Sequence, residues 1–467
     1  METAKSGILR VGSHSKYGFG ELRVKPVEPR FEQYQNSENK TQVTGGDNSC
    51  ETEATAQKSR RRLNKEIVFA STVNRAITNC AIRRIRGMSF DVAIIGTGPD
   101  PKDRDRDGFA MAYRHAAAYL ERDDCELVAC ADIVPEHAAA FAEHVGLPSS
   151  AVFTDHRELC ARSQPDVVSI CVPPKAHAEL VIDVAQAEGV TAIHCEKPMA
   201  TRWDDCRTMV ETAAAKNVQL TIDHQRRFAT PVRRAKQLLD DDRIGEVRRL
   251  EWSELNLFDA GSHLFDLCDF FLDGETASWA LAGVDTSEER RWFGTRNSAR
   301  AVATWEYENG VQGLATTADG GATPVDAYLR IVGTDGTMEI QPDDGPPLRM
   351  RTDGAWEPVD TGGEHLYGGG SRWQGAITKV ASLTGLREDL GPDRPNYGRA
   401  IDHVVDSLAC GEEPDISGST VLRGTELIFA CWESARRCRR VDLPVQVKGN
   451  PLDEIVEADQ RQPAPSR

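Results

Sequence analysis

The sequence predicts an α/β protein with two folded domains: a doubly wound parallel sheet, then an α+β domain whose sheet is open and mostly antiparallel. Short apolar runs alternate with amphipathic segments between residues 90 and 222, which is typical of parallel strands joined by helical crossovers. Between residues 278 and 341, strand-like runs follow one another without a helix between them. The 467 residues are also about three times the length of a typical single domain.

The first domain is expected to alternate strands and helices in chain order. Each strand is a short apolar run with the length of a buried strand, and each helix has apolar residues at a period of 3.6. The expected strands are Phe90–Ile95, Glu126–Ala131, Val167–Val172, Ala192–Cys195 and Gln219–Ile222. The expected helices are Gly108–Glu121, Pro135–Val145, His177–Glu188 and Trp203–Lys216.

The second domain is expected to build a sheet that helices cover on one face. Its hairpins are indicated by the turn sequences Glu308–Gly310 and Thr334–Gly336. Its exposed sheet face would be free to bind a partner subunit. The expected strands are Val247–Glu254, Ser278–Val284, Ala301–Tyr307, Val311–Thr317, Ala327–Gly333 and Thr337–Gln341, and the expected helices are Thr230–Asp240, Ser262–Leu272, Tyr397–Leu408 and Ser419–Arg437.

The composition excludes several classes of function. Hydrophobic residues make up 40% and charged residues 28%, which is typical of soluble globular proteins. The net charge of −17 repels phosphate backbones, so we expect no nucleic-acid partner. No apolar run approaches the roughly 18 residues of a membrane helix, so we expect no membrane partner. The 12 cysteines form no C-x-x-C pair and no zinc-ligand spacing, so we expect a cytoplasmic protein with reduced thiols and no metal site.

The two ends of the chain are expected to lie outside the folded domains. Residues 1–88 are polar and lack a sustained period, which predicts a disordered extension. Two alternatives stay open. In the first, Ser59–Lys65 and the apolar residues after it form a twin-arginine export signal, which they faintly resemble although Asn74 and Arg75 interrupt the apolar segment. In the second, the biological chain begins at Met88. The expected boundaries are 1–88 for the extension, 89–222 for the first domain, 223–446 for the second and 447–467 for a polar tail.

Glycines at the carboxyl end of the first strand predict a dinucleotide site. Gly96, Thr97 and Gly98 follow the strand directly, where glycines permit a tight turn and a close approach of the backbone to a pyrophosphate. The third glycine, Gly108, comes late because the charged insertion Pro99–Asp107 precedes it. The insertion either bulges outward as a solvated loop or contacts phosphate through its cations.

The residue that closes the second strand indicates which dinucleotide binds. Asp132 lies 24 residues after Gly108 (132 − 108), close to the spacing of about 20 at which an acid binds the ribose hydroxyls. A carboxylate there repels a 2′-phosphate, and the next residue, Ile133, offers no cation for one. The sequence therefore predicts NAD or NADP as cofactor, with a slight preference for NAD.

Lys197, Asp259 and His263, which come later in the chain, predict chemistry on a hydroxyl group. Lys197 follows a strand at the edge where open α/β sheets bind ligands. A cation there stabilises a developing alkoxide, or passes a proton if desolvation lowers its pKa. Asp259 and His263 are four residues apart at a helix start, so they share one face. Imidazole suits removal of a hydroxyl proton near neutral pH, and a carboxylate can orient it. The alternatives are that Asp259 is only the helix N-cap and that His263 is a hydrogen-bonded core histidine.

Five short motifs follow the strands in a fixed order: Cys171–Pro174 with His177, Cys195–Pro198, Arg226–Phe228, Asp259–His263 and Val332–Thr337. With these motifs the chain resembles the Gfo/Idh/MocA oxidoreductases from about Phe90 to Leu443. The resemblance implies an N-terminal Rossmann domain, catalytic roles for Lys197, Asp259 and His263, and a homodimer or homotetramer. It also implies that Pro173, Pro174, His177, Glu196 and Lys197 contact the cofactor, together with Gly96, Thr97, Gly98, Gly108 and Asp132.

The expected activity is hydride transfer between NAD(P) and a CH–OH group of a sugar, cyclitol or related polyol. The glycine loop is longer than in relatives, Asn256–Phe258 stands where relatives commonly have glycines, and the segment from Trp252 to Asp259 is short. These departures leave the substrate open. Two other functions also remain open: a sensor on the same fold that binds nucleotide and sugar without turnover, and a non-redox glycosidase-type enzyme that returns its cofactor unchanged.

Overall fold

The computed structural model describes residues 89–102, 110–288, 290–318, 324–366 and 394–461. The predicted extension 1–88, Gly108 and most of the charged insertion before it lie outside these residues. Among the residues described, no helix combines the length and the apolar character needed to cross a membrane.

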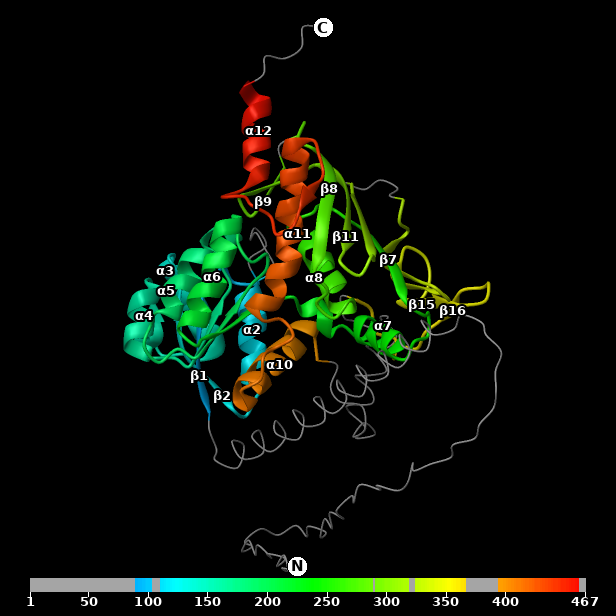
Figure 1. The fold of residues 1–467 in the computed structure, drawn as a ribbon. Coiled ribbons are helices and arrows are strands. Elements are labelled where there is room, and N and C mark those ends of the chain that lie inside the picture. Colours follow the sequence, from blue (N-terminus) through cyan, green and yellow to red (C-terminus); the bar gives the residue numbers. More distant parts are fainter. Residues whose placement is uncertain (1–88, 103–109, 289, 319–323, 367–393, 462–467) are drawn as a thin grey trace, which may run out of the picture. The chain divides into compact units, whose positions relative to one another are not determined.

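The first domain contains a parallel sheet of six strands in the order β3-β2-β1-β4-β5-β6 (Figure 1). The order reverses between β1 and β4, which is the doubly wound arrangement. The strands are β1 (Phe90–Ile95), β2 (Cys125–Ala131), β3 (Val152–Phe153), β4 (Val167–Ile170), β5 (Ala192–Cys195) and β6 (Gln219–Ile222). This sheet confirms the predicted fold of the first domain.

Helices cover both faces of this sheet, and alternate residues of β1 pack into two different apolar clusters, one on each face. Val92 and Ile94 belong to one apolar cluster with the two helices that follow β1 and β2, whereas Ala93 and Ile95 belong to another with the three later helices. The helices are α2 (Met111–Leu120), α3 (Pro135–Val145), α4 (His156–Ser163), α5 (His177–Ala185) and α6 (Trp203–Ala215). Single 3-10 turns occur at Ser149–Ala151, Pro174–Ala176 and Gln225–Phe228.

The second domain contains a nine-stranded sheet in the order β16-β15-β14-β13-β7-β12-β11-β8-β17. All its neighbouring strands are antiparallel except β7 and β12, so the predicted open, mostly antiparallel sheet is confirmed. Its strands are β7 (Val247–Glu254), β8 (Ala277–Asp285), β11 (Arg300–Tyr307), β12 (Gln312–Thr317), β13 (Ala327–Gly333), β14 (Thr337–Pro342), β15 (Leu348–Arg351), β16 (Glu357–Pro358) and β17 (Val441–Asp442). A separate hairpin joins β9 (Arg290–Trp292) to β10 (Thr295–Asn297).

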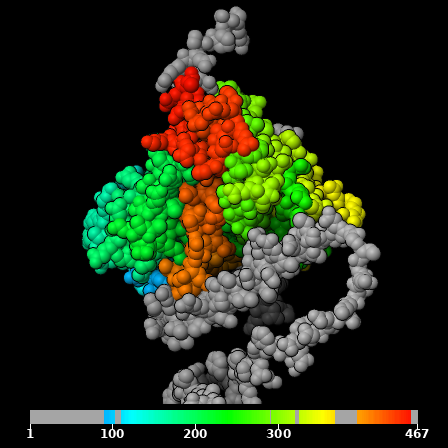
Figure 2. All heavy atoms as spheres, viewed as in Figure 1, coloured from blue at the N-terminus to red at the C-terminus, as the bar shows by residue number. Residues whose placement is uncertain are grey.

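Five helices accompany this sheet: α7 (Thr230–Asp240), α8 (Gly261–Phe271), α10 (Asn396–Cys410), α11 (Gly418–Arg437) and α12 (Pro451–Arg461). Helix α11 lies between α6 of the first domain and β8 of the second sheet (Figures 1 and 2). Helix α10 returns to the first domain, where Ile401 and Val405 join the apolar cluster around α2. The two domains therefore share a continuous packed interior through α10 and α11.

The segment after residue 446 differs from the predicted polar tail, because it contains helix α12. The Asn450 side chain accepts a hydrogen bond from the Leu452 backbone N–H at 2.9 Å, and Pro451 occupies the first helical position, where its missing N–H has no cost. Leu452 is fully buried in the main apolar cluster. The sequence carried a signal for this helix that the prediction missed, because Leu452, Ile455 and Val456 are spaced i, i+3 and i+4 behind Pro451.

Candidate active site

The carboxyl ends of the parallel strands bring the predicted site residues to one edge of the first sheet. Beyond the named strands, the backbone N–H of Cys171 donates to Ile95 O at 2.8 Å, and that of Glu196 donates to Ile170 O at 2.9 Å. The glycine loop, the Val172–Pro174 turn and the Glu196–Lys197 turn therefore lie next to one another. Ligands bind at this edge in open α/β sheets.

The first glycine of the loop is required by close packing. Gly96 has φ +84°, and a Cβ built on it would overlap Val172 Cγ1. Gly98 also has positive φ, +63°, but a Cβ there would meet no atom within 4 Å. Gly96 is thus needed by the fold of the loop itself, whereas the space at Gly98 is open toward the cavity that it lines.

Asp132 holds the glycine loop. Its Oδ2 accepts a hydrogen bond from the Gly98 backbone N–H at 2.9 Å and another from Thr97 Oγ1 at 3.2 Å. Its Oδ1 accepts from the Val134 backbone N–H at 2.9 Å. Asp132 is not among the residues that line the cavity described next, so its predicted contact with ribose stays a prediction.

A cavity of about 600 Å³ opens beside the glycine loop. It brings together nine of the predicted site residues: Gly96, Thr97, Gly98, Pro173, Pro174, Glu196, Lys197, Asp259 and His263. Its wall also contains residues that the sequence did not single out for this site, among them Arg114, Phe293, Asn396 and Tyr397. These come from α2, the β9–β10 hairpin and α10. Tertiary structure alone brings these elements to the cavity, so no local motif could have identified them.

Lys197 and Asp259 form an ion pair at the wall of this cavity. Lys197 Nζ lies 2.9 Å from Asp259 Oδ1 and donates a second hydrogen bond to the Asp259 backbone carbonyl at 3.2 Å. The side chains are 19% and 16% exposed. The alternative interpretation of Asp259 as the N-cap of α8 is wrong, because Ala260 occupies the N-cap position and the Asp259 carboxylate pairs with Lys197. Asn256 Oδ1 accepts from the N–H groups of residues 258, 259 and 260 in the turn before the helix.

His263 lies in the first turn of α8 and is almost completely buried. Its Nδ1 has no hydrogen-bond partner among the described residues, which does not fit the alternative of a hydrogen-bonded core histidine. Its ring meets that of His224 edge to face at 5.2 Å. Burial lowers the pKa of His263 well below its ordinary 6.5, and the charges of Arg226 and Lys197 lower it further. A neutral imidazole at the cavity wall is able to accept a proton. The predicted orienting of His263 by Asp259 stays a prediction.

His177 does not line the cavity. Its Nδ1 lies 2.8 Å from Pro198 O and its Nε2 lies 2.9 Å from Val172 O, and the ring is fully buried. Burial lowers its pKa. His177 therefore joins the turn that contains Val172 to the turn that contains Lys197, so it contributes to the shape of the cavity wall from behind.

Glu196 lines the cavity, and its carboxylate contacts His115, a residue that the sequence analysis did not identify. Glu196 Oε1 lies 3.2 Å from His115 Nε2, and Glu196 Oε2 accepts from the Lys197 backbone N–H at 3.2 Å. Burial by itself raises the pKa of Glu196, but the hydrogen bond and charge of His115 and the charge of Lys197 outweigh it, so the pKa is lowered. His115 lies on α2 after the glycine loop. Its place on the apolar face of that helix was the one sequence signal for it.

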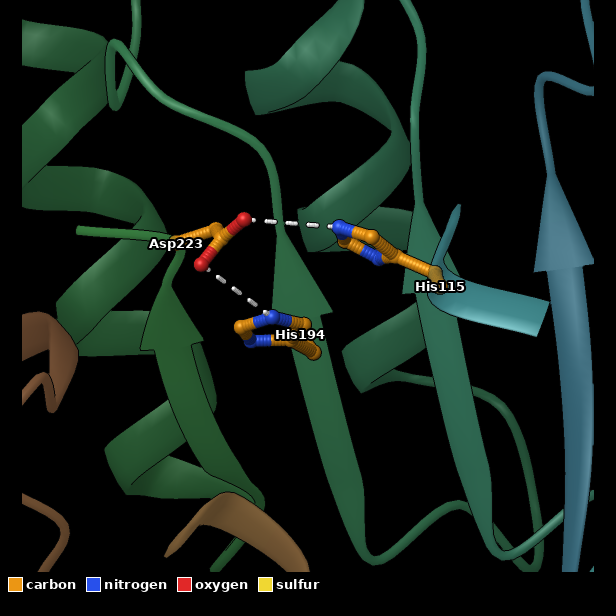
Figure 3. Close-up of side chains that lie close together, drawn as sticks. All are labelled: His115, His194 and Asp223. Atoms are coloured by element: carbon orange, nitrogen blue, oxygen red, sulfur yellow. Dashed lines mark ion pairs between the residues drawn. The ribbon is translucent and has the colours of Figure 1, made fainter. Parts of the chain in front are cut away.

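One group of described residues has the donor types of a metal site: His115, His194 and Asp223 (Figure 3). Asp223 Oδ2 faces His115 Nε2 at 3.4 Å, and Asp223 Oδ1 faces His194 Nε2 at 3.8 Å. The two imidazole rings are stacked, with centroids 5.1 Å apart and an angle of 29° between their planes. Ring nitrogens bind metals within the ring plane, so stacked rings do not converge on one ion. We therefore interpret the group as a buried cluster of polar side chains.

Comparisons with known proteins agree with this architecture. Residues 90–224 match the description "Oxidoreductase family, NAD-binding Rossmann fold", and residues 250–443 match "Oxidoreductase family, C-terminal alpha/beta domain". The chain is 29% identical to a 1-carboxy-3-chloro-3,4-dihydroxycyclohexa-1,5-diene dehydrogenase of Comamonas testosteroni over 71% of this chain and 81% of that protein.

Other matches are partial or reach only the fold. The chain is 32% identical to a D-glucoside 3-dehydrogenase of Escherichia coli over 28% of this chain and 37% of that protein. The chain covers only 37–56% of the length of the first curated relatives that it matches. An inositol dehydrogenase homologue of Azotobacter vinelandii, solved with NADH and myo-inositol, superposes with a TM-score of 0.59 at 18% identity, covering 76% of this chain and 98% of that one. This likeness shows the fold.

Proposed function

Because the chain belongs to the Gfo/Idh/MocA family of oxidoreductases, we propose that it transfers a hydride between NAD(P) and a CH–OH group of a sugar, cyclitol or related polyol. The activities of two relatives support a polyhydroxylated substrate, since one is a D-glucoside 3-dehydrogenase and another an inositol 2-dehydrogenase. The observation that carries the proposal is the meeting of Lys197, Asp259 and His263 in one cavity with the glycine loop.

The glycine loop fits a dinucleotide. Gly98 leaves open space at the cavity, and α2 begins at Met111, beyond the insertion, so that its first-turn N–H groups can help bind phosphate. Arg114 on the same helix lines the cavity and adds a cation. When bound, the nicotinamide ring would accept or return the hydride. The carboxylate of Asp132 next to the loop supports a preference for NAD over NADP.

His263 is the proposed proton acceptor during alcohol oxidation. Its imidazole is held neutral by burial and by the nearby cations, so it is ready to take the hydroxyl proton at neutral pH. The same cations would favour release of the proton after the reaction. In the reverse direction, protonated His263 would return the proton to the carbonyl oxygen.

Lys197 is the proposed electrostatic partner of the reacting oxygen. Its ammonium group is fixed by Asp259 at 2.9 Å, so little reorganisation is needed when negative charge develops on the substrate. Asp259 acts through Lys197 and prevents it from leaving the cavity wall. Lys197 has one donor left for the substrate, because an ammonium group carries three and Asp259 accepts two of them.

The proposal is tested by replacing Lys197 while cofactor binding is followed separately. We expect Lys197→Met to lower kcat by at least about 10²-fold, as loss of a preorganised donor does, and to leave NADH affinity within a few fold. Lys197→Arg, which keeps the charge, should retain part of the activity. Turnover is assayed as NADH formation with a panel of sugars, cyclitols and alditols.

Normal turnover by Lys197→Met would remove Lys197 from the mechanism. Cofactor that stays bound and unreduced while a glycoside is cleaved would instead favour the non-redox enzyme. Cofactor and sugar binding without any reaction would favour the sensor.

A further inference from the structure

The buried imidazole of His115 lies where three strands of the first sheet end. His115 is on α2, and its ring has no exposed surface. Its Nδ1 lies 2.7 Å from Ser169 Oγ of β4 and 3.5 Å from Cys171 Sγ. Its Nε2 lies 3.2 Å from Glu196 Oε1, after β5, and 3.4 Å from Asp223 Oδ2, after β6. One side chain of α2 thus contacts β4 and the segments after β4, β5 and β6.

The surroundings of His115 suit an imidazolium. Two carboxylates lie 3.2 and 3.4 Å from Nε2 as ion-pair contacts, and a hydroxyl that can accept a hydrogen bond lies 2.7 Å from Nδ1. Burial lowers the pKa of His115, but Cys171 and the hydrogen bonds to Asp223 and Glu196 outweigh burial and raise it well above 6.5. A cation here also balances two carboxylates that would otherwise be buried close together.

Glu196 connects His115 to the wall of the cavity. One of its carboxylate oxygens faces His115, and the other accepts the backbone N–H of Lys197 at 3.2 Å. Lys197 in turn holds Asp259 of the second domain. A chain of short contacts therefore runs from the helix after the glycine loop, through Glu196, to the ion pair at the cavity wall.

We propose that His115 is a positioning residue of this active site, whose ring fixes the Glu196 carboxylate and thereby the turn that presents Lys197 to the substrate. This inference rests on the proposed function. It differs from a packing role, because it requires the Nε2 edge of the ring to face the Glu196 carboxylate and an effect on kcat. His194 provides the contrast: it is equally buried, stacks on His115 and bonds Thr221 at 2.9 Å, and its closest carboxylate is Asp223.

The charge state of His115 depends on groups from every element packed against it. Its own helix contributes Tyr119, whose hydroxyl is buried, and the turn of Glu196 brings the charge of Lys197 nearby. Burial raises the pKa of Asp223 to about 6. The other groups that face it are Ser169 and Cys171 after β4, His194, Cys195 and Glu196 from β5 and its end, and Asp223 after β6.

The test compares two replacements of His115 that differ in where they place an N–H. In His115→Gln the amide reaches the position of Nε2, so it can still donate to Glu196, whereas the shorter amide of His115→Asn cannot. We expect His115→Asn to lower kcat by roughly tenfold to a hundredfold, as a misplacement of about 1 Å does, and His115→Gln to recover most of the loss. The control His194→Asn should lose thermal stability but keep its kcat.

Several outcomes would overturn the inference. It fails if His115→Asn keeps wild-type kcat, or if both replacements of His115 lower kcat alike. If His115→Asn does not fold, Ser169→Ala, which removes the partner of Nδ1 at little steric cost, should lower kcat several-fold, and unchanged kcat overturns the inference. A divalent metal bound stoichiometrically by the wild type and lost in His115→Asn would also overturn it, since His115 would then be a ligand.

The failure of this inference can be told from failure of the proposed function. If the wild-type chain binds neither NADH nor NADPH, the proposed function falls and this inference falls with it. If the wild type turns over a polyol and His115→Asn does so equally well, only the positioning role falls.

Discussion

The neutral state of His263 sets the expected pH dependence of the reaction. A base whose pKa is lowered is deprotonated, and so active, above that pKa, and its activity is lost as the pH falls through it. Since the pKa of His263 lies well below 6.5, kcat/KM for alcohol oxidation should stay level down through pH 6.5 and decline only at lower pH. This is measured as a pH–rate profile. A decline centred at or above pH 6.5 would contradict the assignment of His263 as the base.

Arg226 provides a charge-specific test of the same group. Its guanidinium lines the cavity, contacts the Tyr328 hydroxyl and lowers the pKa of His263. Arg226→Gln removes the charge, so the acidic limb of the pH–rate profile should move upward, whereas Arg226→Lys should leave it near its original place. Equal shifts in both variants would show that geometry rather than charge is responsible.

Among individual residues, the sequence predicted those of the site only where they follow a strand or lie at the start of a helix. Lys197, Asp259 and His263 have such places, and they meet in the cavity. His115 was missed because its partners Ser169, Glu196 and Asp223 are 54 to 108 residues away, and only the sheet brings them together. The bonding of the turn before α8 by the Asn256 side chain likewise depends on loop geometry.

At the scale of structural elements, we predict different effects of replacing the two glycines of the glycine loop. Gly96→Ala should lower both thermal stability and NADH affinity, because its Cβ would overlap Val172. Gly98→Ala has space within the protein and should lower stability less, by about 1 kcal/mol for its positive φ, while still weakening NADH binding. Thermal unfolding and NADH titration measure the two effects. Unchanged NADH affinity in Gly98→Ala would mean that no dinucleotide approaches this loop.

Helix α8 is anchored by a buried arginine. Arg227 donates to both carboxylate oxygens of Asp266 at 2.7 Å and to Asp269 at 3.1 Å, and its side chain is 4% exposed. Arg227→Ala should lower the free energy of unfolding by about 3–5 kcal/mol, because it leaves the buried Asp266 carboxylate without its arginine partner, whereas Asp269 keeps Arg423. The exposed pair of Arg207 and Glu211 is the control, and Arg207→Ala should cost about 0.5 kcal/mol or less. Urea unfolding distinguishes them, and similar losses would contradict the role of burial.

Element predictions succeeded for segments with a clear apolar pattern, including the four-residue strands Ala192–Cys195 and Gln219–Ile222, and failed for the shortest and the most polar segments. The expected strand at Phe90–Ile95 and helix at Pro135–Val145 have the observed bounds. Strand β3 has two residues, too few to show a period of 2, so it was missed. Helix α4 after it was missed because its mostly polar sequence has only Leu159 and Cys160 buried.

At the scale of the whole molecule, we propose that two copies of the chain associate through the open face of the second sheet. Leu281 on β8 and Val302 on β11 are 44% and 59% exposed on that face. Farther along, Glu339 on β14 is 1% exposed and pairs with Arg330 and Arg349. Such a sheet face, partly apolar and partly organised by charge pairs, suits a second copy of the chain.

Val302→Glu should therefore shift the chain toward the monomer, because it places a charge in the proposed interface. Ile133→Glu changes an equally apolar residue that is 89% exposed on the first domain, and it should leave the oligomeric state unchanged. Light scattering coupled to size exclusion measures both. A wild-type monomer, or an oligomer that survives Val302→Glu, would contradict the proposal that this face is the interface.

The most direct test of the central claim is a fluorescence titration of the full chain with NADH and, separately, with NADPH. The cavity beside the glycine loop predicts saturable binding, with NADH tighter than NADPH because Asp132 lies next to the loop. Tighter binding of NADPH would overturn the preference but keep the oxidoreductase. Binding of neither by folded protein would contradict the claim that this cavity holds a nicotinamide cofactor.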